Sequence, residues 1–145
     1  MKTDSTIAAI HKFDPKAGLK LPLFLSSVSA GFPSPAEDHI DKRLDLNEML
    51  VAHPAATFFV RVAGDSMTGA GINHDDILVV DRSLEPANGK VVIAVLNGEL
   101  TVKRLFRDGE SFRLAAENPA YPDRLLVEGE SCEIWGVAIF VIHSL

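Results

Sequence analysis

From Thr57 onward the apolar residues fall into short runs that are rich in β-branched and aromatic side chains, a composition typical of β-strands. These runs span residues 57–63, 77–80, 90–96, 99–106 and 133–142, and Gly, Asn, Asp or Pro separates them. No long helical pattern interrupts the series. The pattern therefore predicts a mainly β domain, built from antiparallel strands, over residues 57–145.

The first part of the chain is patterned differently. Residues 1–30 show no convincing period and predict an N-terminal arm, extended in places, which is too short for a helix-turn-helix domain. Ser34 and Asp45 can each cap a helix, since glutamate follows three residues later. Ile40 and Leu44 would form the buried face of the first helix. Residues 31–56 are thus expected to be a linker with two short helices.

One β-hairpin can be read in register. Asn97-Gly98 is a strong type I′ turn signal between two apolar runs. A two-residue loop pairs Leu96 with Glu99 and, further along, Val92 with Lys103. Lys103 then shares its face with apolar neighbours, where burial disfavours an ammonium and favours a neutral amine that can act as a base.

A serine lies on a predicted turn after the first strand. Gly64-Asp65-Ser66-Met67 leads from this strand into a glycine-rich segment. A serine at a strand end can expose its hydroxyl, and a neutral lysine can take its proton. Ser66 and Lys103 therefore form a candidate Ser-Lys dyad. His53 and His74 are weaker candidate bases for a histidine-based triad, because each lies beside a proline or within a turn.

Composition and charge limit the kinds of partner and binding site that we expect for the chain. The chain has 145 residues, which suits one domain, and its net charge is −6, so direct DNA binding is not expected. Cys132 is the single cysteine, and the five histidines show no metal-ligand spacing with it, so neither a disulfide nor a metal site is predicted. No apolar stretch is long enough for a membrane helix. A soluble, cytoplasmic protein without cofactor is expected.

Four segments of the sequence resemble the LexA/UmuD family of self-cleaving proteins. They are Phe59 to Met67, Gly71 to Val79, Gly98 to Leu105, and Ala30 to Asp38, the last of which looks like a cleavage segment. The resemblance implies that Ser66 is the nucleophile, that Lys103 is the general base, and that backbone N–H groups of Asp65 and Ser66 hold the oxyanion. It also implies cleavage between Ala30 and Gly31, which would remove residues 1–30. UmuD-type segments can carry cysteine at the position of Ala30, but LexA-type repressors also cut between alanine and glycine.

The family resemblance implies partners as well. It implies a homodimer, stimulation of cleavage by a RecA–single-stranded DNA filament, and a trimmed form that serves a UmuC-like Y-family polymerase in translesion synthesis during the SOS response. Three alternatives stay open: a non-catalytic polymerase-binding module, a fragment of a LexA-like repressor, and a signal-peptidase-like enzyme. Too few residues precede Ala30 for a recognition helix, and no membrane span accompanies the dyad, which weakens the last two.

Overall fold

The computed structural model describes residues 4–13, 20–24, 40–121, 124–125 and 131–145. The chain forms two compact units. The larger comprises Met1–Phe13 together with His53–Leu145, and the smaller comprises Asp14–Ala52. The N-terminal residues therefore belong to the same unit as the β domain.

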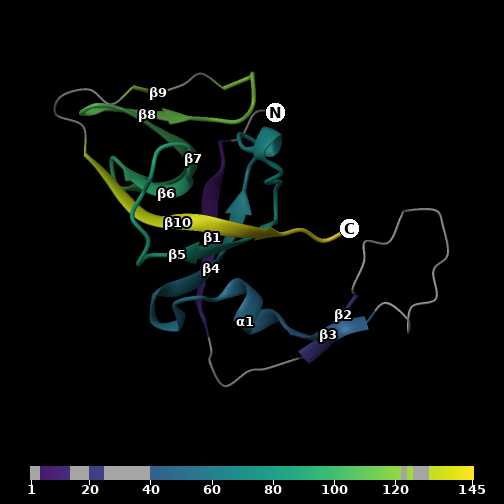
Figure 1. Ribbon diagram of the computed structural model, residues 1–145. Helices are drawn as coiled ribbons and strands as arrows, with labels where there is room; N and C mark the ends of the chain where they lie inside the picture. Colours follow the sequence, from purple (N-terminus) through teal and green to yellow (C-terminus); the bar gives the residue numbers. More distant parts are fainter. Residues whose placement is uncertain (1–3, 14–19, 25–39, 122–123, 126–130) are drawn as a thin grey trace. The chain divides into compact units, whose positions relative to one another are not determined.

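The larger unit is an antiparallel β-sheet. Its strands are β1 (Thr6–Lys12), β4 (Thr57–Ala63), β5 (Ile77–Asp81), β6 (Val91–Leu96), β7 (Glu99–Asp108), β8 (Ser111–Ala115), β9 (Arg124–Leu125) and β10 (Cys132–Ile142), with 3-10 turns η2 (Pro54–Ala56) and η3 (Thr68–Ala70). The strand order is β1-β4-β5-β10-β6-β7-β8-β9, and β1 also pairs with β7, so the sheet closes on itself. Figure 1 shows β1 beside β4. The predicted antiparallel β class is confirmed.

The smaller unit holds β2 (Lys20–Phe24), β3 (Ile40–Asp45) and α1 (Leu46–Leu50). The Asp45 side chain accepts a hydrogen bond from the Asn47 N–H at 2.9 Å, so the second predicted helix start is confirmed. The expected helical face of Ile40 and Leu44 is wrong, because both residues lie in β3. Their backbone pairs with β2, which satisfies the hydrogen-bonding groups in a strand instead. The Ser34 helix start lies outside the described residues.

Alternating strand residues, together with Met67 and Ile72 between β4 and β5, supply two apolar clusters to the larger unit. The first comprises Val60, Val62, Met67, Ile72, Leu78, Val80, Ile93 and Val102. The second comprises Val92, Ala94, Leu105, Leu114 and Val137. The β6–β7 hairpin contributes to both, since Ile93 and Val102 face one cluster while Val92 and Leu105 face the other. The hairpin is thereby fixed on two sides.

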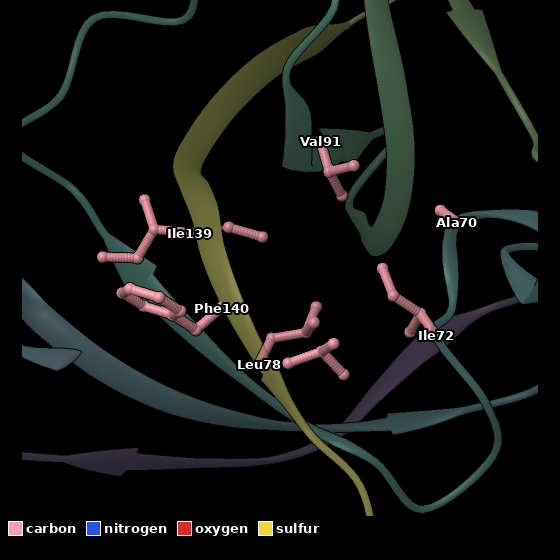
Figure 2. A pocket seen from close by; sticks show the side chains of 8 residues that line it. Ala70, Ile72, Leu78, Val91, Ile139 and Phe140 are labelled. Atoms are coloured by element: carbon pink, nitrogen blue, oxygen red, sulfur yellow. The ribbon is translucent and has the colours of Figure 1, made fainter. Parts of the chain in front are cut away.

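An apolar pocket opens beside β10 (Figure 2). It is lined by Ala70, Ile72, Leu78, Val91, Ala138, Ile139, Phe140 and Val141. None of these side chains carries a group for acid–base chemistry. The pocket is therefore not a candidate for the catalytic site.

The described residues include neither a long apolar helix nor a cluster of metal ligands. In that part of the chain, no helix combines the length and the apolar character that crossing a membrane requires. Within the same residues, no group of three or more His, Cys, Asp or Glu side chains is arranged to hold a metal ion.

Candidate active site

The β6–β7 hairpin holds Lys103 in the protein interior. The register runs from Leu96 opposite Glu99 to Val92 opposite Lys103, as the Asn97-Gly98 turn predicted. Asn97 and Gly98 adopt φ values of 50° and 84°, which a type I′ turn requires. Lys103 is only 6% exposed. A lysine at this position must find a polar partner, because burial of an unpaired ammonium is costly.

Ser66 lies on the turn that follows β4. Gly64 has φ of 99°, a conformation open to glycine, and this lets the chain leave the strand sharply. Ser66 and the next residue, Met67, are both fully buried, and Met67 belongs to the first apolar cluster. The turn is therefore anchored in the core directly beside the serine.

A second segment, residues 117–121, is hydrogen-bonded to the turn that carries Ser66. The Glu117 N–H donates to the Ser66 carbonyl at 2.9 Å, and the Gly69 N–H donates to the Glu117 carbonyl at 2.7 Å. The Asn118 side-chain amide donates to the Asp65 carbonyl at 2.9 Å. We name residues 117–121 the clamp segment. Its bonds fix the backbone on both sides of the serine side chain.

The clamp segment also engages the side chain of Asp65. The Tyr121 hydroxyl donates to the Asp65 carboxylate at 2.6 Å. Partial burial, then the hydrogen bond to Asp65 and its charge, raise the pKa of Tyr121 to about 12. Tyr121 therefore remains a neutral donor at physiological pH, and the Asp65–Ser66 backbone keeps its orientation.

Ser66 and Lys103 contact two consecutive residues, Asp4 and Ser5. Lys103 Nζ donates to Asp4 Oδ1 at 2.9 Å. The Ser5 N–H in turn donates to Ser66 Oγ at 2.9 Å. The structure thus brings the two predicted dyad residues to adjacent positions of one segment, although they come from separate parts of the chain.

The electrostatics of Asp4 fit this arrangement. Burial alone would raise the pKa of its carboxyl group, but hydrogen bonds from Ser66 and Lys103, together with the lysine charge, hold the pKa below its ordinary value. Asp4 is therefore a carboxylate at neutral pH. While Lys103 is paired with it as an ammonium, the lysine has no lone pair with which to accept a proton.

The candidate histidines have other partners than Ser66. His53 pairs with the buried carboxylate of Asp81 at 2.5 Å, and the His74 ring accepts a hydrogen bond from the Gly64 N–H at 3.1 Å. Ala30 and Gly31 lie outside the described residues. The sequence analysis missed Asp4, Ser5 and the clamp segment. The Asn118-Pro119 dipeptide signals a loop, but it gives no sign of which turn that loop holds.

Comparison with known proteins shows which family the chain belongs to. The Peptidase S24-like family model matches residues 22–139. Protein ImpA of Salmonella typhimurium is 46% identical over 123 residues, which cover 84% of this chain and 83% of ImpA. Protein MucA of the same organism is 44% identical over 126 residues, covering 86% of this chain and 84% of MucA.

A repressor is also similar over most of this chain. The LexA repressor of Paracidovorax citrulli is 40% identical over 126 residues, which cover 87% of this chain and 55% of the repressor. The matched region includes the serine turn and the β6–β7 hairpin, since the family model extends across both. These matches confirm the resemblance drawn from the sequence motifs, and the chain belongs to the Peptidase S24-like family.

Proposed function

We propose that this protein is a serine endopeptidase that cleaves its own Ala30–Gly31 bond, with Ser66 as nucleophile and Lys103 as general base. The observation that carries the proposal is the convergence of two buried residues, Ser66 and Lys103, on the consecutive residues Asp4 and Ser5. A buried lysine is costly to maintain for structure alone. A Ser-Lys dyad needs such a lysine near a serine, and both residues here are buried and contact the same short segment.

The residues have defined tasks in this reaction. Neutral Lys103 takes the proton of the Ser66 hydroxyl, and Oγ attacks the carbonyl carbon of Ala30. Backbone N–H groups at Asp65 and Ser66 hold the oxyanion, and the clamp segment keeps that backbone in place. The tetrahedral intermediate expels the Gly31 amine, which takes the proton from Lys103. Water then hydrolyses the acyl ester, releases the Ala30 carboxylate and restores the Ser66 hydroxyl.

The cellular role follows from the resemblance to UmuD-type proteins. In this role a RecA–single-stranded DNA filament stimulates the cut during the SOS response. The product, residues 31–145, forms a homodimer and serves a UmuC-like Y-family polymerase in translesion synthesis. Similarity to ImpA and MucA along most of the chain supports placing the protein in this context.

Two substitutions with matched controls test the catalytic assignment. Ser66→Ala and Lys103→Ala should each lower the rate of self-cleavage by at least about a thousandfold, because each removes a group that acts on the reacting atoms. Ser111→Ala and Lys90→Ala change an exposed serine and an exposed lysine and should leave the rate unchanged. Mass spectrometry of the incubated protein measures the rate and identifies the fragment.

The wild-type fragment should begin at Gly31. A fragment that begins elsewhere would refute the proposed cleavage site. Cleavage at the wild-type rate by either Ser66→Ala or Lys103→Ala would refute the dyad.

A further inference from the structure

The catalytic cleft, by which we mean the position beside Ser66 that a substrate must take, is already occupied by a peptide strand, residues 4–12 of the chain itself. The Ser5 carbonyl accepts hydrogen bonds from the Val102 N–H at 3.1 Å and from the Thr101 hydroxyl at 3.0 Å. Thr6 then pairs with Thr101 of β7 and with Ala63 of β4. Residues 4–12 thus bridge β4 and β7 as an added strand, in the way that extended peptides bind to open sheet edges.

This strand excludes a substrate. A carbonyl carbon that Ser66 attacks must approach Oγ to about 3–3.5 Å. The Ser5 nitrogen lies 2.9 Å from the same oxygen and presents its N–H to it. Two peptide groups cannot occupy this position at once, and Asp4 meanwhile holds the Nζ of Lys103.

We propose that residues 4–12 are an internal competitor for the catalytic cleft, so that self-cleavage requires the end of β1 to leave before the Ala30–Gly31 segment can enter. This inference rests on the proposed self-cleavage and names how it is regulated. The rate of cleavage then follows the fraction of molecules in which Asp4 and Ser5 are undocked.

The subsite that holds Ser5 also indicates which residue the cleft prefers. Ser5 is fully buried, and among the residues that the structure describes no hydrogen-bond partner reaches its hydroxyl. An unpaired buried hydroxyl is unfavourable, so the subsite fits a methyl group better than it fits serine. The unpaired hydroxyl therefore weakens docking of the competitor.

The test uses substitutions in residues 4 and 5 that either weaken or strengthen docking of the competitor, made in the uncleaved chain. Asp4→Ala removes the ion pair with Lys103, and Ser5→Leu is too large for the buried subsite. Each should raise the self-cleavage rate roughly tenfold or more. Ser5→Ala removes the unpaired hydroxyl, strengthens docking, and should slow cleavage by roughly fivefold or more. Asp108→Asn removes an exposed charge at the far end of β7 and should have no effect.

Amide hydrogen exchange gives a readout that does not depend on catalysis. The Val102 N–H is bonded to the Ser5 carbonyl, so it should be protected in the wild type and in Ser5→Ala but exchange faster in Asp4→Ala and Ser5→Leu. Fast exchange of the Val102 N–H in the wild type would refute the proposal that residues 4–12 occupy the cleft. So would a wild type that cleaves itself while Asp4→Ala and Ser5→Leu are no faster. If neither the wild type nor any variant cleaves itself, the proposed function is refuted. The exchange rate of the Val102 N–H then shows by itself whether residues 4–12 are docked.

Discussion

Gly69 offers a direct test of the clamp segment. A Cβ atom at this position would lie 2.5 Å from the backbone oxygen of Glu117 and 3.2 Å from its carbonyl carbon. Backbone atoms cannot rotate away as a side chain can. Gly69→Ala must therefore push residue 117 away from the serine turn.

The cost follows from the contacts that are lost. Overpacking of this kind costs about 1–3 kcal/mol. The displacement also stretches the Gly69–Glu117 and Glu117–Ser66 backbone hydrogen bonds, each worth about 1 kcal/mol. Gly69→Ala should thus lower the free energy of unfolding by about 3–5 kcal/mol. A shift of the serine by about 1 Å should lower the cleavage rate by about a hundredfold.

Gly109→Ala is the matched control. Gly109 has φ of 62°, and a Cβ atom at this position would have no neighbour within 4 Å, so alanine there meets backbone strain but no clash. Its cost should be about 1–2 kcal/mol, with the cleavage rate unchanged. Urea unfolding followed by the fluorescence of Trp135, the one tryptophan, measures stability. Wild-type stability and wild-type cleavage in Gly69→Ala would show that the clamp does not hold the turn.

Two further predictions concern polar side chains, Asn118 and Asp81. Asn118→Ala removes the hydrogen bond to the Asp65 carbonyl and should slow cleavage about tenfold. It should also lower the free energy of unfolding in urea by about 1 kcal/mol. An unchanged cleavage rate would contradict the positioning role of Asn118. Burial would raise the pKa of Asp81, but hydrogen bonds from Ser83 and His53 hold this pKa below the ordinary value of 3.8. The ionised Asp81 therefore stabilises the folded state above pH 3.8. This stabilisation is lost as the pH falls through the lower pKa of the folded state. Unfolding between about pH 5 and pH 2 should show this acid loss in the wild type and a smaller one in Asp81→Asn; equal losses would contradict it.

The parts of the site that depend on local patterns were predictable. Asn97-Gly98 defines a turn whose geometry fixes the register, and the register alone places Lys103 opposite Val92 on an inward face. Gly64 beside Ser66 likewise marks a turn, and the structure confirms it with a positive φ. Short-range chemistry determines both features, so the sequence is sufficient for them.

The parts that depend on contacts distant in sequence were not predictable. β1 has exposed residues at many positions, because it is held mainly by backbone pairing with β4, and so no hydrophobic period marks it. Asp4 reaches Lys103 only once that pairing is in register. The clamp segment contacts the serine turn through backbone groups, which every residue carries. Backbone pairing leaves no compositional signal in a single sequence.

The closed sheet also explains why the cleft exchanges strands and does not stand empty. When Asp4 and Ser5 leave, the Val102 N–H and the Thr101 hydroxyl lose their partner, and the Lys103 ammonium loses its counter-charge. Such groups are costly to leave unpaired in a partly buried site. Water can satisfy some of them, but an incoming extended segment satisfies all the backbone groups at once. The open cleft is therefore the least favourable state. A segment that displaces the end of β1 gains the interactions that β1 loses. Regulation of self-cleavage then depends on the difference in affinity between two segments of one chain, a difference that small changes at Asp4 or Ser5 can reverse.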